Sequence, residues 1–281
     1  MLSLLKIKGM LDQLSASERK LADFILDNSH LLRDYSSQQL ADAVGISQSS
    51  VVKFCQKLGY KGYPDLKLAI TEALVTATTL QREQPDSSRE EGSMAQLTEL
   101  LQQTMVQNLR NLMNVNSEST LKHAAQLLDQ ADKILVAGSG HSAIVALDMQ
   151  CRLLELGKLA LHHTDPALCL QLSRTLGKHS VVMLISDCGQ NADMLRLEQF
   201  AKERQLYVIS LTQFQSNAQS AAADIRLFTL GSDANTPFQH VMIQQAQQHL
   251  CHLLYLYLSQ RTANQQHLCE LAPLLARLEK N

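Results

Sequence analysis

The stretch SSQQLADAVGISQSSVVKFCQKLGYKGY, residues 36–63, decides the fold of the first part of this chain. Gly45 stands between two helical patterns, and glycine readily adopts the positive φ that a tight turn between helices requires. The apolar residues that follow it recur at the spacing i, i+3, i+4, i+7, which places them on one stripe of a second helix: Val51, Phe54, Cys55 and Leu58. The stretch therefore predicts a helix-turn-helix.

The opposite face of the second helix has side chains that suit the major groove of DNA. Ser47 is placed to cap this helix. Glutamine reads adenine, serine bonds bases or phosphates, valine meets a thymine methyl, and lysine meets the phosphates that supply most of the affinity. The alternative is a polar surface helix in an ordinary helical hairpin. The predicted DNA-binding residues are Ser47, Gln48, Ser49, Ser50, Val52, Lys53, Gln56, Lys57 and Lys61.

The composition is that of a soluble globular protein with room for two domains. Of the 281 residues, 45% are hydrophobic and 19% are charged, and no segment approaches the roughly 20 apolar residues of a membrane span. The net charge of −2 argues against indiscriminate polyanion binding but allows a local basic face. Lys6 and Lys8 interrupt the apolar start of the chain, and the six cysteines form no CxxC pair, so we expect a cytoplasmic protein with reduced thiols.

The chain divides into a helical module, a linker and a longer second domain. Two capping-box patterns mark helix starts in the first module, Ser15 with Glu18 and Ser36 with Gln39, and Pro64 opens another helix. The next segment is polar and contains proline, glycine and mixed charges, which is typical of a flexible linker. The predicted boundaries are 1–75 for the helix-turn-helix domain, 76–93 for the linker and 94–281 for the second domain.

The second domain alternates short apolar runs with helical stretches, after two helices over 94–113 and 118–130. This pattern predicts an α/β domain with a five-stranded, parallel, doubly wound sheet, whose ligands bind at the carboxyl ends of the strands. The predicted strands are 133–137, 159–162, 180–185, 206–211 and 225–230. The predicted helices are 141–156, 166–176, 190–204, 236–260 and 264–279.

Two turns after strands are suited to hold an anionic ligand. Glycines allow close approach of the backbone, while hydroxyls and free helix N–H groups supply donors. The predicted effector-binding residues are Gly138, Ser139, Gly140, Ser142, Ser186, Cys188, Gly189 and Asn191. Two alternatives stay open for the first turn: a simple strand-to-helix connection, and a loose GxGxxG/A dinucleotide site with Asp165 as its ribose-binding acid.

On these residues the whole chain resembles the RpiR-type transcriptional regulators. The resemblance rests on GISQSSVVKFCQKLGYKGYPDLK on the DNA side, and on Gly138-x-Gly140-x-Ser142 with the turn at 186–191 on the ligand side. It implies a helix-turn-helix joined to a sugar-isomerase (SIS) domain. Because that domain is attached to a DNA reader, we expect it to sense a ligand rather than to catalyse a reaction, and we expect no cofactor and no metal. It also implies regulation of sugar-catabolic genes, by repression or activation, through a phosphorylated sugar and a DNA operator, within homodimers or homotetramers.

The second turn departs from the pattern that the resemblance implies, Ser-x-Ser-Gly-x-Thr. Cys188 replaces the second serine, and a thiol is a poorer donor than a hydroxyl. Asn191 replaces the threonine. Asp187 adds a carboxylate close to the expected phosphate, where like charges weaken binding. An effector site that is altered or degenerate is therefore an alternative.

Three further possibilities arise: a phosphosugar isomerase, a metal site and a subunit contact. A phosphosugar isomerase needs a proton-transferring base, for which His141, His162, His163 and Asp165 are candidates near strand ends. A metal site is suggested by His240, His249, Cys251 and His252, but no further ligand completes a tetrahedral set, so we expect none. An apolar stripe on the long helix suits either a subunit contact or the domain's own core: Leu250, Leu253, Leu254 and Tyr257.

Overall fold

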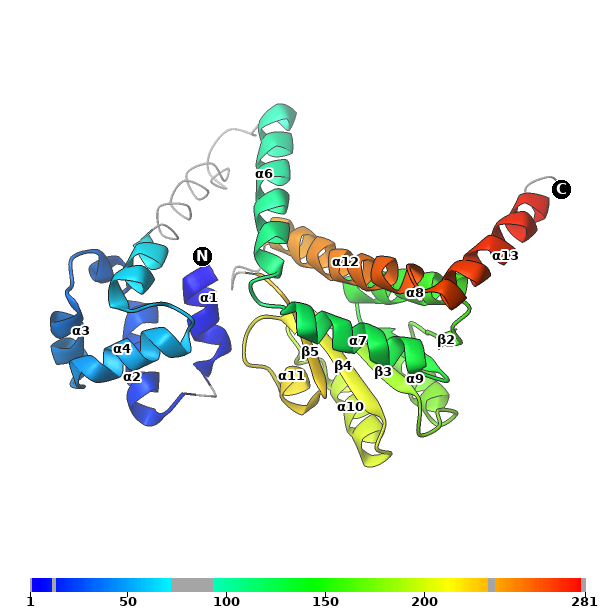
Figure 1. Ribbon diagram of the computed structural model, residues 1–281, viewed down its shortest axis with the longest axis horizontal. Coiled ribbons are helices and arrows are strands. Elements are labelled where there is room, and N and C mark those ends of the chain that lie inside the picture. Colours follow the sequence, from blue (N-terminus) through cyan, green and yellow to red (C-terminus); the bar gives the residue numbers. More distant parts are fainter. Residues whose placement is uncertain (1, 12–13, 72–92, 232–235, 279–281) are drawn as a thin grey trace. The chain divides into compact units, whose positions relative to one another are not determined.

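The contacts of the computed structural model divide the chain into two compact units, which are described separately (Figure 1). The structure describes residues 2–11, 14–71, 93–231 and 236–278. The first unit comprises Met1–Val106 with Phe214–Ser216, and the second comprises Gln107–Gln213 with Asn217–Asn281. Except for Ser93, the predicted linker lies outside the described residues.

The DNA-binding module predicted within unit 1 is helical, as the sequence indicates. A further helix over residues 63–71 begins one residue before the predicted Pro64. The 3-10 helix η2 between α2 and α3 was not predicted. The elements are α1 (Leu2–Gly9), α2 (Ala16–Asp27), η2 (Ser29–Arg33), α3 (Ser37–Val44) and α4 (Gln48–Lys57).

The helix starts in unit 1 are fixed by side-chain caps. Ser15 and Glu18 form a capping box at α2, and Ser36 and Gln39 form another at α3, each satisfying two backbone N–H groups that the helix leaves open. Gly45 ends α3 in the left-handed conformation with φ of 71°. The predicted turn between the two helices is therefore confirmed.

The apolar stripe of α4 points into a single core. Phe54 is the largest of its side chains, and it is fully buried with residues of α2 and α3 such as Leu21 and Leu40. The exposed fractions of the stripe are 0% for Val51, Phe54 and Cys55, and 3% for Leu58. Burial of this stripe leaves the polar face of α4 outside.

Unit 2 contains the predicted five-stranded parallel sheet. Its strand order is β2-β1-β3-β4-β5, and each neighbouring pair is parallel. The chain therefore leaves β1 toward β2 on one side and reaches β3 on the other, which makes the carboxyl end between β1 and β3 the topological switch point. The strands are β1 (Ile134–Gly138), β2 (Ala160–Leu161), β3 (Val181–Ile185), β4 (Tyr207–Gln213) and β5 (Ile225–Thr229).

Helices cover both faces of this sheet (Figure 1). Helices α7, α8 and α12 pack on one face and α9, α10 and α11 pack on the other. The short α11 was not predicted. No helix in the described part of the chain is long and apolar enough to cross a membrane. The bounds are α6 (Met94–Leu112), α7 (Glu118–Gln130), α8 (His141–Glu155), α9 (Pro166–Ser173), α10 (Ala192–Glu203), α11 (Ala218–Ala222), α12 (Pro237–Ser259) and α13 (Thr262–Leu278).

One buried carboxyl group of α10 couples the stability of unit 2 to pH. Glu198 is 2% exposed, and its Oε1 has no hydrogen-bond partner among the described residues. Burial raises the pKa of this carboxyl from 4.5 to about 7, against the attraction of Lys202 and with the repulsion of Asp224. Because the folded state holds this proton more tightly than the unfolded state, stability falls as the pH rises from 4.5 to about 7.

We expect Glu198→Gln to remove this pH dependence. One pKa unit corresponds to about 1.4 kcal/mol. The free energy of unfolding of the variant minus that of the wild type should therefore be about 2 kcal/mol larger at about pH 8 than at about pH 5. Urea denaturation at the two pH values measures the difference. Glu203→Gln, an exposed change on the same helix, is the matched control. An equal gain at both pH values would contradict the burial argument.

Candidate DNA-binding face and candidate effector site

The face of α4 opposite the core is open to solvent. Lys53 and Gln56 are exposed, and Val52 between the polar residues is half-buried. Lys61, in the turn after α4, is exposed as well. These side chains are therefore available to a partner of unit 1, and a helix with such a face has the width that the major groove of DNA admits.

Hydroxyl groups gather where α4 begins. The Ser47 side chain accepts a hydrogen bond from the backbone N–H of Ser50 and so caps the helix, as the sequence predicts. Its Oγ lies 2.9 Å from Ser49 Oγ and 2.8 Å from Ser50 Oγ. The Gln48 side chain donates to Ser37 Oγ on α3 at 2.7 Å, so it must release this bond to read a base.

Lys57, at the end of α4, is engaged by the protein itself. Its ammonium donates to Glu18 Oε2 at 2.9 Å. The Lys57 hydrogen bond is the largest of the effects that lower the pKa of Glu18, followed by the bond from the Ser15 backbone N–H. Glu18 thus both caps α2 and holds α4, and it neutralises one of the lysines predicted to meet phosphate.

The two predicted ligand turns begin side by side at the switch point of the sheet. Gly138, the last residue of β1, is the register partner of Ile185, the last residue of β3. A Cβ on Gly138 would lie 2.5 Å from the carbonyl oxygen of Ser142, so only glycine allows this approach. Gly140 and Gly189 have φ of 57° and 67°, which also favour glycine.

Ser142 is buried and already bonded, rather than open to a ligand. It is 1% exposed, and its hydroxyl donates to Asp187 Oδ1 at 2.9 Å. Gln247 on α12, which is fully buried, donates from Nε2 to the same Asp187 oxygen at 3.1 Å. This Ser142–Asp187–Gln247 network joins α8, the turn after β3, and α12.

Sequence reasoning did not identify Gln247. The buried residues around it on α12 are Met242, Ile243, Ala246 and Leu250, which form an ordinary helical stripe. A glutamine at a core position of such a stripe is the one available signal, because a buried amide needs hydrogen-bond partners. The sequence gives no indication of which partners those are.

The other predicted residues of the second turn serve largely to build the turn itself. Ser186 Oγ accepts the backbone N–H of Gly189 at 3.2 Å. Asn191 Oδ1 accepts two N–H groups in the first turn of α10, which makes it a helix cap. Cys188 is exposed, and Ser139 in the first turn is half-buried.

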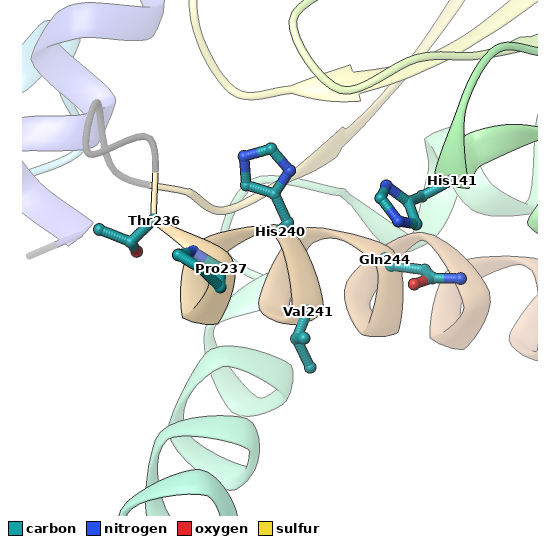
Figure 2. A pocket seen from close by; sticks show the side chains of 6 residues that line it. All are labelled: His141, Thr236, Pro237, His240, Val241 and Gln244. Carbon is teal, nitrogen blue, oxygen red and sulfur yellow. The ribbon is translucent and has the colours of Figure 1, made fainter. Parts of the chain in front are cut away.

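A cavity of about 460 Å³ lies where α8 and α12 begin. His141 directly precedes Ser142, and its ring lies edge-on to that of His240 with the centroids 6.4 Å apart. Figure 2 shows both rings beside α12, with Gln244 one turn further along that helix. The lining residues are His141, Thr236, Pro237, His240, Val241 and Gln244.

The remaining histidine candidates take part in local structure. The Nδ1 atom of His162 lies 2.9 Å from the Val136 carbonyl oxygen. His163 Nδ1 accepts the backbone N–H of Asp165, whose own carboxylate caps α9. None of these three side chains lines the cavity beside Ser142.

The four residues of α12 considered as metal ligands do not meet as a cluster. His252 lies 3.2 Å from Asp148, and Cys251 is fully buried. Among the described residues, no three His, Cys, Asp or Glu side chains are grouped so that they can hold a metal ion. In the predicted stripe of this helix, Leu250 and Leu254 are buried within unit 2, while Leu253 is half-buried and Tyr257 is exposed.

A known sequence family matches each of the two predicted domains of this chain. A helix-turn-helix domain of the rpiR family matches residues 1–77, and a SIS domain matches residues 127–256. The chain is 33% identical over 267 residues to YfhH of Escherichia coli (strain K12), described as an uncharacterized HTH-type transcriptional regulator, with 92% of each chain covered. It is 31% identical to the similarly described YbbH of Bacillus subtilis (strain 168), covering 81% of this chain and 79% of that protein.

Two solved structures illustrate the similarity of fold. One is the Vibrio vulnificus NanR protein complexed with ManNAc-6P, with a TM-score of 0.63, 22% identity, and coverage of 99% of this chain and 100% of the other. The other is the sugar isomerase domain of an RpiR transcription factor from Sphaerobacter thermophilus, with a TM-score of 0.56, 19% identity, and coverage of 65% and 99%. These structures show the same fold, while the matched domains and the full-length relative show the family: this chain belongs to the rpiR family of transcriptional regulators, with an N-terminal helix-turn-helix and a SIS domain.

Proposed function

We propose that this regulator is a cytoplasmic homo-oligomer that binds a DNA operator through α4 and controls genes of sugar metabolism. In this proposal residues 1–75 bind DNA, 76–93 link the domains, and 94–281 sense a phosphorylated sugar without converting it. The observation that carries the DNA-binding part is the exposed polar face of α4, with Lys53 and Gln56 outside and Phe54 in the core. The similar NanR protein is complexed with ManNAc-6P, a sugar phosphate, which supports the same class of ligand here.

An exposed apolar stripe on α8 supports assembly into at least a dimer. The stripe consists of Ile144, Leu147 and Leu154, which are 59%, 47% and 47% exposed. Large apolar side chains at helical spacing on one surface are typical of a face that another chain covers. A dimer also presents two copies of α4, which successive major grooves of an operator require.

The effector site is proposed at the switch point, because the two turns there meet between β1 and β3. An effector that favours one arrangement of the oligomer changes the spacing of the two α4 helices and hence the affinity for DNA. By linkage, DNA changes the affinity for the effector by the same factor, typically about 5–150-fold. No step of this scheme needs a reaction, so the SIS domain acts as a sensor.

Replacing Lys53 with glutamate tests the DNA-binding face. We expect Lys53→Glu to weaken binding to all duplexes by about tenfold or more, and to reduce the slope of log affinity against log salt by about 1, because a phosphate contact is lost. Gln48→Ala should cost about 1–3 kcal/mol at one base position only. The probes are a duplex selected from a random pool by the wild type, and an unrelated duplex.

The control for charge is Lys178→Glu, which makes the same change at an exposed position of unit 2. It should leave the affinity for both duplexes unchanged. The assay repeated with glucose 6-phosphate and with ManNAc-6P measures the coupling to an effector. DNA affinity that survives both Lys53→Glu and Gln48→Ala would contradict the assignment of this face of α4.

A further inference from the structure

The carboxylate of Asp187 stands at the place where the proposed effector site would offer hydrogen-bond donors. Its Oδ1 accepts from the Ser142 hydroxyl at 2.9 Å and from the Gln247 amide at 3.1 Å. Ser142 is 1% exposed and Gln247 is fully buried, so both donors are shielded from water and held in place. The two donors that the core presents at this point are therefore already used by an acidic side chain of the protein.

The two carboxylate oxygens of Asp187 differ in their contacts. Among the described residues, Oδ2 accepts no hydrogen bond, while the backbone carbonyl of the residue accepts Gln213 N–H at 3.0 Å. Asp187 is half-buried, so its side chain is reached by solvent and hence by a small ligand. Within the described part of the chain, the carboxylate is thus fixed through one oxygen and unbonded at the other.

This arrangement selects for the charge of the ligand group. A phosphate at the turn would meet a carboxylate of like charge and would find Ser142 and Gln247 already bonded. An ionised carboxylate is only an acceptor, and a cationic donor forms its strongest hydrogen bonds. An ammonium group, or less strongly a hydroxyl, therefore fits the open Oδ2, and a phosphate does not.

The cavity beside the network offers a separate place for a phosphate. His141 directly precedes Ser142 in the chain, and Gln244 and His240 lie three and seven residues before Gln247 on α12. At 1.5 Å per residue the cavity begins about 5–10 Å from the network along that helix. The imidazoles of His141 and His240 line it (Figure 2), and imidazole N–H groups are donors for phosphate oxygens.

We propose that Asp187 is a specificity-determining residue that makes an amino sugar phosphate the effector. Its Oδ2 accepts the amine of the sugar, and the phosphate lies in the cavity lined by His141 and His240. This inference rests on the proposed function, since it names the class of sugar phosphate that the same site takes. The resulting orientation keeps the phosphate away from the turn over residues 186–191.

Calorimetric titration with four probes tests this assignment: glucose, glucosamine, glucose 6-phosphate and glucosamine 6-phosphate. The full-length wild type should bind glucosamine 6-phosphate about tenfold or more tightly than glucose 6-phosphate. Asp187→Asn should abolish this difference, because a neutral amide lacks the charge that holds the amine. The same variant should bind glucose 6-phosphate at least as tightly as the wild type, which also demonstrates that its site is folded.

Asp193→Asn is the matched control, because it removes a carboxylate six residues away that contacts Arg196 rather than the network. It should preserve the preference for the amine. Equal binding of the two phosphorylated probes by the wild type would overturn the inference and leave a sugar phosphate effector intact. A preference for the amine that persists in Asp187→Asn would overturn it as well. Binding of neither phosphorylated probe, with DNA binding retained, would overturn both this inference and the proposed effector.

Discussion

Replacing Phe54 with alanine will lower the free energy of unfolding of unit 1 by about 3–5 kcal/mol, the usual cost of removing a fully buried aromatic side chain. Phe54 is 0% exposed at the centre of the core that joins α2, α3 and α4. A module of about 75 residues has a total stability of only about 4–11 kcal/mol. The substitution therefore removes a large share of that stability, and DNA binding should be lost with it.

Unit 2 should be unaffected by Phe54→Ala, because its sheet has a core of its own that includes Leu135, Val182 and Val208. Urea denaturation followed by circular dichroism should show the transition of unit 1 at lower urea and that of unit 2 unchanged. Gln56→Ala, an exposed change on the same helix, should alter stability by no more than about 0.5 kcal/mol. One shared transition that moves as a whole would contradict independent cores.

Comparison with Lys53→Glu separates folding from recognition on the same helix. Lys53 is exposed and Phe54 is buried, although they are adjacent in the sequence. The lysine variant should lose affinity for DNA and keep its unfolding transition, while the phenylalanine variant should lose both. This contrast follows from the amphipathic character of α4, in which neighbouring residues face opposite environments.

The sequence was sufficient for those features that local interactions determine. The caps Ser15, Ser36 and Ser47 are side chains that bond backbone groups within three residues, and all three were predicted. Gly45 was predicted because a positive φ is a property of the residue itself. The strands were found because apolar runs between helical patterns mark buried parallel strands.

The features that the sequence did not indicate depend on residues far apart in the chain. Ser142 and Asp187 were both noticed, but their hydrogen bond joins positions 45 residues apart, and nothing in the local pattern predicts it. Gln247 is 105 residues from Ser142 and was missed altogether. Asn191 shows a different limit, because a side chain suited to bind phosphate serves equally well as a helix cap, and here it caps α10.

A second large effect is expected from Gly138→Ala, which should lower the free energy of unfolding of unit 2 by about 3 kcal/mol. The added Cβ would lie 2.5 Å from the carbonyl oxygen of Ser142 and 2.7 Å from its carbonyl carbon. Both are backbone atoms at the start of α8, so they cannot turn aside as a flexible side chain does. The first turn of α8 must shift, and the Ser142 hydroxyl moves away from Asp187 with it.

Gly177→Ala, in the loop before β3 of the same unit, is the control for Gly138→Ala. A Cβ on Gly177 meets no atom within 4 Å and its φ is not positive, so the substitution should change the free energy of unfolding by no more than about 0.5 kcal/mol. Urea denaturation compares the two stabilities, and titration with glucosamine 6-phosphate compares the sites. Equal losses of stability would show that α8 relaxes around the methyl group. In that case the close approach of β1 to α8 does not position the Ser142 hydroxyl beside Asp187. The hydrogen bonds of Gln247 alone would then hold the hydroxyl there.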